Sequence, residues 1–316
     1  MKTNQWFRLL LIISTLILCV SELAAYENYK FLTEIDTVKV PYASRLAIED
    51  YTLYVYGDSL LKVYSANNIS HPKLVTEFKT NEDLNSIEPV PPYDMIVIGP
   101  MELALQENDD TNKTGKIIHV QTFNGTNSAR QGSTLYIADA DTGLQIVELG
   151  HGSIGRVISY FHDYLGLKAL DVKWPLIYAL NKFGLVVIDA SDLSAPVAKG
   201  SNYQILDARC IAVKDTFALI GTKNSVIVMS IKNPDKPYIV TQAAYPFPVQ
   251  SIRIRGTSAF VCLGKGGLRV LDVSYPKRPM ESNSYRGKDR IFDVAFSDDY
   301  VYVADGRGGI RVLLYH

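Results

Sequence analysis

The chain has 316 residues, of which 47% are hydrophobic and 21% are charged, and its formal net charge is -1. This composition excludes a disordered chain, and the near-neutral charge provides no basic footprint for nucleic acid. The length allows one large all-β domain or two ordinary domains with a sizeable core. The 20 tyrosines add to the Val, Ile and Phe residues and favour β-strands.

The first 25 residues are predicted to be a secretory signal that is removed from the mature chain. Lys2 and Arg8 precede an apolar run at 9–20, and small residues follow it as far as Ala25. The run is too short for a comfortable transmembrane helix, and no later segment could span a membrane. We therefore expect a periplasmic, cell-surface or secreted protein, with residues 26–316 forming a single domain.

Export permits disulfides, glycans and lipid anchors, and the sequence bears on each of them. Cys210 and Cys262 lie in apolar, strand-like runs, so a pair of free thiols and one disulfide both remain open. Cys19 in the leader has neighbours that fit a lipid-attachment site poorly, so lipid anchoring is not expected. Acceptor sequons for N-glycosylation begin at Asn68, Asn112 and Asn124.

A repeat of 41 or 42 residues organises the chain. Each unit contains an apolar strand preceded by a turn, as in "GLVVID" at 184–189. The residue at the start of that strand serves as the anchor of each unit. The anchors are Leu60, Glu102, Gly143, Gly184, Ser225, Gly267 and Gly309. A regular period of this length is typical of propellers and other repeat architectures.

Four strands are predicted in each unit. An alternating run such as 293–299 precedes a compact apolar strand, and the anchored strand comes third. A last strand follows a proline in several units, at Pro72, Pro196, Pro237 and Pro279. Proline at the start of a strand suits a sheet edge, where its missing N–H costs no ladder bond. Four strands with the last one outermost are typical of a propeller blade.

The two ends of the chain predict how the ring closes. The seventh unit ends at 309–316 without a fourth strand, whereas the segment at 29–38 is similar to the fourth strand of unit one and has no unit of its own. Pairing this segment with the C-terminal blade would leave no open edge. The predicted fold is therefore an all-β, seven-bladed β-propeller of four-stranded blades, closed by an N-terminal strand at about residues 29–38.

The segments "GLVVIDASDLSAP" (184–196) and "GLRVLDVSYPKRP" (267–279) resemble the LVIVD repeat, which is found in exported and cell-surface proteins of bacteria and archaea. The resemblance covers the mature chain and is closest in units four to seven. It implies a β-propeller that displays a binding surface, and it implies no catalytic residue. Unit two departs most from the pattern, with Pro100 in its turn and an insertion at 107–115.

The glycine-rich turns at 262–271 and 304–313 do not fit a phosphate-binding loop. Such a loop places its amides at the start of a helix, followed by Lys and a Ser or Thr. Here an apolar strand follows Gly267 and Gly309 instead. These glycines are expected to supply a positive φ in hairpin turns.

Motifs for catalysis or metal binding are not evident in the sequence. The five histidines show neither His-x-His nor helical spacing, and the insertion at 107–115 lacks the closing Glu of a calcium-binding hand. No Gly-x-Ser-x-Gly elbow is present. We therefore expect no catalytic residue, no cofactor and no resident metal.

The innermost strands provide a candidate ligand site around a central channel. Asp293 is expected to be equivalent to Arg45, Ser86, Ser128, Ala169, Cys210 and Ser251. Charge near the channel is expected from Arg45, Glu88, Asp171, Arg253 and Asp293. Arg45, Arg253 and Asp293 are the candidate ligand contacts at the channel mouth, and no paired-carboxylate geometry follows from these positions.

These observations favour an exported, non-enzymatic binding or interaction module at the cell envelope or cell surface. Its expected partner is a protein or a glycan rather than nucleic acid, bound by one face of the disc or by the tip near 107–115. The alternative is a propeller enzyme, a hydrolase or lyase with its ligand site at the channel mouth. A structural spacer in a larger envelope complex is a third possibility. The ligand, the face that binds it and the oligomeric state remain open.

Overall fold

The computed structural model describes residues 31–80, 83–90, 94–98, 105–107, 117–119, 124–150 and 153–316. Regular secondary structure in these segments is β-strand, and they contain no helix long and apolar enough to cross a bilayer. The predicted signal at 1–25, Cys19, Pro100, Asn112 and the tip at 107–115 apart from Glu107 lie outside the described residues. Export and the role of the tip therefore stay predictions.

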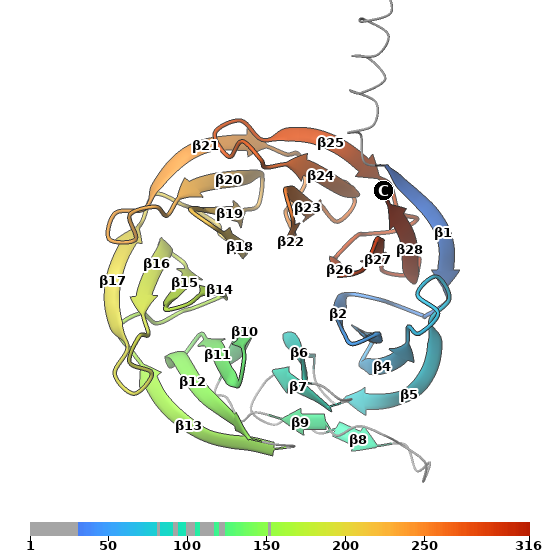
Figure 1. Cartoon of the computed structure of the whole chain (residues 1–316), viewed down its shortest axis with the longest axis horizontal. Coiled ribbons are helices and arrows are strands. Elements are labelled where there is room, and N and C mark those ends of the chain that lie inside the picture. Colours follow the sequence, from blue (N-terminus) through green and yellow to red (C-terminus); the bar gives the residue numbers. More distant parts are fainter. Residues whose placement is uncertain are drawn as a thin grey trace, which may run out of the picture.

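The strands form sheets arranged in a ring around a common centre (Figure 1). Three sheets from the middle of the chain have four antiparallel strands each, numbered outward from the centre. They are β10 (Gly125–Gln131), β11 (Thr134–Asp139), β12 (Gly143–Gly150) and β13 (Ser153–Phe161); β14 (Ala169–Lys173), β15 (Leu176–Asn181), β16 (Gly184–Asp189) and β17 (Val197–Asn202); and β18 (Cys210–Lys214), β19 (Phe217–Gly221), β20 (Ser225–Ser230) and β21 (Tyr238–Ala244).

Three further sheets contain the same four-stranded arrangement. One consists of β22 (Ser251–Arg255), β23 (Ser258–Cys262), β24 (Leu268–Asp272) and β25 (Met280–Tyr285). Another consists of β26 (Asp293–Ser297), β27 (Tyr300–Ala304), β28 (Ile310–Tyr315) and β1 (Leu32–Val38). The last consists of β2 (Arg45–Glu49), β3 (Thr52–Gly57), β4 (Leu60–Ser65) and β5 (Lys73–Thr80), with β8 (Leu105–Glu107) added outside β5.

The second unit does not form the four-stranded blade that the repeat predicts. Its sheet has three described strands, β6 (Ser86–Val90), β7 (Asp94–Ile98) and β9 (Ile117–His119). β9 runs parallel to β7, and β8 pairs with β5 of the preceding sheet. A parallel partner cannot be reached through a tight hairpin and needs a longer connection. The insertion at 107–115 falls in the sequence between β7 and β9. Within the described residues the expected seven four-stranded blades are thus corrected to six, with this smaller sheet between two of them.

Most other features of the repeat are confirmed. The third strand begins at or directly after the predicted anchor in each described unit, as β16 does at Gly184 and β28 does after Gly309. The fourth strands β5, β17, β21 and β25 each begin directly after the predicted proline. The anchor Glu102 lies outside the described residues.

β1 and β28 bring distant parts of the chain into one sheet. They pair antiparallel from Leu32 opposite Tyr315 to Val38 opposite Ile310, with one register shift (Figure 1). The Phe31 amide also donates to the His316 carbonyl at 2.7 Å. The strand predicted at about residues 29–38 is therefore the fourth strand of the sheet that contains β26, β27 and β28.

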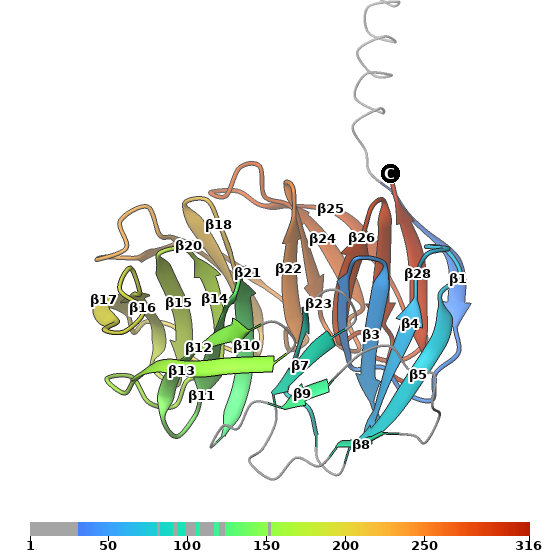
Figure 2. The same ribbon diagram turned by 60° about the horizontal axis from the view of Figure 1, so that its bottom comes forward.

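The hydrophobic core lies between neighbouring sheets, which stand beside one another around the ring (Figure 2). One cluster joins Leu185 and Val187 of β16 to Ile220 and Ile227 of the next sheet. The second strand of a sheet is buried along its whole length in β19 and β23, which explains their mainly apolar sequences. The outermost strands are largely exposed, as in β17 and β21.

Candidate functional site: the central channel

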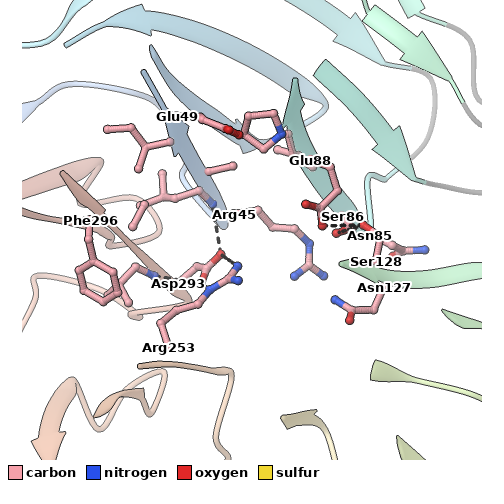
Figure 3. Close-up of a pocket in the computed structure, with 17 residues that line it drawn as sticks. Arg45, Glu49, Asn85, Ser86, Glu88, Asn127, Ser128, Arg253, Asp293 and Phe296 are labelled. Carbon is pink, nitrogen blue, oxygen red and sulfur yellow. Dashed lines mark hydrogen bonds and ion pairs between the residues drawn. The ribbon is translucent and has the colours of Figure 1, made fainter. Parts of the chain in front are cut away.

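A cavity of about 1040 Å³ lies at the centre of the ring, lined by residues from the inner strands of the sheets. A second cavity of about 350 Å³ lies between β2, β6, β10 and β26 (Figure 3). Four charged residues, Arg45, Glu88, Arg253 and Asp293, line both cavities. Asp171 lines the larger cavity, so the structure brings all five predicted charged residues to the channel.

Side chains line the channel in layers because alternate residues of a strand point to the same side. The ring predicted around Asp293 consists of the first residues of inner strands, except for Ser128, which lies inside β10. Two residues further along the strands lies a second layer. It consists of Ala47, Glu88, Arg130, Asp171, Ala212, Arg253 and Ala295. Arg130 was not among the residues predicted from the sequence, although its spacing of two residues from Ser128 indicates a place in this layer.

Arg253 and Asp293 form an ion pair in the channel. Arg253 Nη2 lies 3.4 Å from Asp293 Oδ2. The buried Asp293 carboxylate also accepts the Leu46 amide of β2 at 3.3 Å and the amide of Val294 at 3.0 Å. The charge of Asp293 outweighs burial and raises the pKa of Arg253 above its ordinary value. These contacts fix the Asp293 carboxylate between neighbouring sheets.

Asp171 bridges its sheet to the next one in the same way. Its Oδ2 accepts the Val213 amide of β18, and its Oδ1 accepts the Val172 amide, both at 2.7 Å. Burial raises the pKa of Asp171, although these two donors and the charge of Arg253 oppose the shift. Asn127 makes a related bridge, because its Oδ1 accepts the Leu170 amide at 3.0 Å. Contacts between neighbouring inner strands thus hold the channel side chains in place.

Glu88 of β6 is tied to the neighbouring sheet by a hydroxyl group. Its Oε1 accepts a hydrogen bond from Ser128 of β10 at 2.8 Å, and the Ser128 and Ser86 hydroxyls are 2.8 Å apart. Burial raises the pKa of Glu88, and Ser128 and the nearby arginines only partly offset this effect. No hydrogen bond to Oε2 is found within the described residues.

Arg45 extends into the smaller cavity between two groups of polar side chains (Figure 3). The Arg253–Asp293 pair lies on one side of its guanidinium, and Asn127 and Ser128 lie on the other. Its Nε donates to the Leu84 carbonyl at 3.1 Å. In the described part of the chain, Arg45 forms no ion pair. Its terminal nitrogens therefore keep hydrogen-bonding capacity toward the cavity.

Arg130 is paired with Glu49, which distinguishes it from Arg45. Its Nη2 lies 2.7 Å and 2.6 Å from the two Glu49 oxygens. This ion pair joins β10 to β2, the inner strands on either side of β6. The charge of Arg130 is therefore balanced by Glu49 within the protein.

Cys210 and Cys262 are free thiols, which decides between the two states left open by the sequence. Burial raises the pKa of Cys210 to about 12, and burial likewise raises the pKa of Cys262. Both groups are therefore thiols rather than nucleophilic thiolates near neutral pH. The described residues contain no group of three or more His, Cys, Asp or Glu side chains placed to hold a metal ion.

Replacing Glu88 by glutamine should stabilise the protein at neutral pH. The folded protein holds a proton on Glu88 at pH values where the unfolded chain has lost it, so this group's contribution to stability falls as the pH rises from 4.5 through the raised pKa. Glutamine removes this titration and keeps an oxygen for Ser128. The difference in free energy of unfolding between variant and wild type should be largest at about pH 7 and shrink toward about pH 4.

Urea unfolding at both pH values measures this difference. Glu148→Gln is the control, because the Glu148 side chain is half exposed and pairs with the exposed Arg156. If the difference in free energy of unfolding between Glu88→Gln and the wild type is the same at both pH values, the prediction is wrong.

Comparisons with known proteins agree with the repeat and the fold. Residues 178–203, 248–287 and 291–313 match the model of the LVIVD repeat family. No curated protein matches the chain. Two similar solved structures are the computationally designed Ika8 protein and the WD40 domain of Neurospora crassa Pan2.

The designed protein is 11% identical with a TM-score of 0.60, and the match covers 90% of this chain and 99% of that chain. The WD40 domain is 12% identical with a TM-score of 0.63, and the match covers 90% of this chain and 95% of that domain. Similarity at such low identity supports the β-propeller fold alone.

Proposed function

We propose that this chain, a β-propeller that contains LVIVD repeats, is a non-enzymatic binding module that is exported and works at the cell envelope or cell surface. The observation that carries the proposal is a central cavity whose charged side chains are held by neighbouring sheets before any ligand binds. A preorganised site loses little conformational freedom on binding, which favours affinity. The expected partner is a protein or a glycan.

The binding site of this module is the channel mouth around Arg45, Arg253 and Asp293. The cavities, of about 350 Å³ and 1040 Å³, have the size of small-molecule sites. The Asp293 carboxylate already accepts hydrogen bonds from Arg253 and from backbone amides, so it shapes the site. Arg45 can contact a ligand directly.

Blocking the channel mouth should abolish binding. Lys168 is exposed and lines the larger cavity, so Lys168→Trp adds bulk at the site without entering the core. Lys277→Trp is the matched control, because Lys277 is exposed in the loop between β24 and β25 and lines neither cavity. Residues 26–316 would be tested against arrays of glycans and of purified envelope proteins. Equal retention by the two variants would count against the channel as the binding site.

Export is tested separately. The chain with residues 1–25 should reach the envelope or the medium of an expressing cell, and the chain without them should stay inside. Cell fractionation distinguishes the two, and equal distributions would exclude a role for the leader.

The alternative function, a hydrolase or lyase, is favoured by one observation. Glu88 has a raised pKa and, beside a cavity, an oxygen to which no described residue hydrogen-bonds, and both properties suit a general acid. Incubation of the purified protein with sugars and lactones would test it. Turnover that is lost in Glu88→Gln would establish the enzyme, whereas ligand binding without turnover would support the binding module.

We further infer that the sheet of β6, β7 and β9 occupies the place of a seventh blade and that β1 closes the ring. The inner strand β6 lines the same cavities as the other inner strands, and Ser86 and Glu88 contact β10. β1 covers the edge of β28 that would otherwise be unpaired.

Deletion of β1 should open the ring. A chain that begins at residue 39 should unfold at a much lower urea concentration than a chain that begins at residue 26, and its β28 amides should exchange faster with solvent. Unchanged unfolding and unchanged exchange would exclude closure by β1.

A further inference from the structure

Arg45 carries a positive charge into the channel that the described chain does not neutralise. Arg253 and Arg130 each pair with a carboxylate, whereas the hydrogen bond found for Arg45 within the described residues is the one to the Leu84 carbonyl. Its guanidinium is directed into the smaller cavity (Figure 3). A planar guanidinium with free N–H groups matches a planar carboxylate, which it can bind through two parallel hydrogen bonds.

The side chains beside Arg45 have unused hydrogen-bonding groups of both kinds. Asn127 accepts the Leu170 amide through Oδ1, which leaves its NH₂ group as a donor. Asn85 donates through Nδ2 to the Gly125 carbonyl at 2.7 Å, which leaves its Oδ1 as an acceptor. Glu88 accepts from Ser128 through Oε1, which leaves Oε2 to donate to a ligand hydroxyl when the carboxyl is protonated and to accept when it is ionised. The cavity therefore suits a ligand with several hydroxyl groups in addition to one anionic group.

The same cavity also has an apolar side, formed in part by Phe296 and Pro89. The Phe296 ring packs against Phe260 of the neighbouring sheet, with ring centroids 4.7 Å apart, and is thereby held in place at the edge of the cavity. A sugar ring combines a hydroxyl edge with an apolar C–H face, and this combination matches the lining. A cavity of about 350 Å³ is at the lower end of the volumes of small-molecule sites, which suits a single sugar unit.

We propose that the channel binds an acidic sugar, with the sugar carboxylate paired to Arg45 and its hydroxyl groups bonded to Glu88, Asn85 and Asn127. The proposal rests on the binding function proposed above and names its ligand. The neighbouring Asp293 does not repel the carboxylate, because Arg253 balances its charge. Burial raises the pKa of Glu88, which reduces repulsion from that side.

Calorimetric titration with D-glucuronate, D-glucose and acetate tests the proposal on residues 26–316. The wild type should bind glucuronate at least about tenfold more tightly than glucose or acetate, because each of these lacks half of the required groups. Arg45→Gln should weaken glucuronate binding by about tenfold to 100-fold. Arg45→Lys keeps the charge but loses the two-point contact, so its affinity should lie between the two.

Arg278→Gln is the matched control, because Arg278 is exposed in the loop between β24 and β25, lines neither cavity and has no ion pair in the described chain. It should bind glucuronate like the wild type. Urea unfolding of each variant shows whether it is folded. Asn127→Ser is a second variant, which weakens the contacts to the sugar hydroxyl groups and keeps the charge of Arg45.

The possible outcomes separate this inference from the proposed function. Equal glucuronate affinity in wild type and Arg45→Gln overturns the role of Arg45. Tighter binding of neutral sugars, or of a peptide with a free C-terminal carboxylate, overturns the acidic sugar but leaves a binding module. Failure of every array ligand to bind overturns the proposed function itself.

Discussion

Replacing Asp305 by alanine is expected to lower the free energy of unfolding by about 3–5 kcal/mol. Asp305 is fully buried and accepts Arg311 Nε at 3.0 Å, together with the amides of Lys288 at 2.7 Å and Asp289 at 2.9 Å. Alanine would remove the acceptor of the Lys288 and Asp289 amides. Among the described residues, it would also leave the Arg311 guanidinium, 1% exposed, with the Glu34 carboxylate at 3.2 Å as its one counter-ion.

Urea unfolding measures this loss. Asp299→Ala is the control, because the Asp299 side chain is 75% exposed and lies 3.8 Å from Arg255, so the change should be about 0–1 kcal/mol. Asp305→Asn keeps an acceptor oxygen and should lie between the two variants. A loss below about 1 kcal/mol for Asp305→Ala would show that the buried cluster does not hold this sheet together.

Gly309→Ala is expected to cost about 3 kcal/mol or more, for two separate reasons. Gly309 has a φ of 81°, in the left-handed region that disfavours a side chain. An added Cβ would also lie 2.6 Å from the Val38 carbonyl oxygen of β1. The variant would therefore strain the turn before β28 and push β1 away from it.

Gly132→Ala separates these two effects. Gly132 also has a positive φ, 59°, but nothing lies within 4 Å of its added Cβ. Its cost should be the conformational penalty alone, about 1–2 kcal/mol. The difference in free energy of unfolding between the two variants measures the cost of the close contact with β1. Equal losses in urea unfolding would mean that β1 moves away from the added Cβ without a loss of stability.

Periodicity made most of the strands predictable, because each repeat places the same residue types at the same strand starts. The anchor at Gly184 and the proline before β17 are examples. β1 was predictable for another reason: it resembled a fourth strand that had no unit of its own. The parallel pairing of β9 with β7 was not predictable, because unit two departs from the repeat pattern that guided the other assignments.

The candidate site was predictable in position but not in its interactions. Alternation along the inner strands places Arg45, Arg253 and Asp293 at the channel. Their pairing depends on how far each side chain reaches across to a neighbouring sheet, which strand spacing alone does not determine. The sequence therefore did not distinguish the paired Arg253 from Arg45, whose guanidinium faces the cavity.

The pairing of β1 with β28 has a consequence for biosynthesis. β1 leaves the ribosome before all the other described strands, whereas the segment of β28 that it pairs with, Ile310–Tyr315, is made after them. Throughout synthesis β1 is therefore an unpaired strand that other chains could capture. Contacts this far apart in sequence also slow folding. A chaperone that shields β1, or that delays its release until β28 has been made, should therefore raise the yield of folded protein.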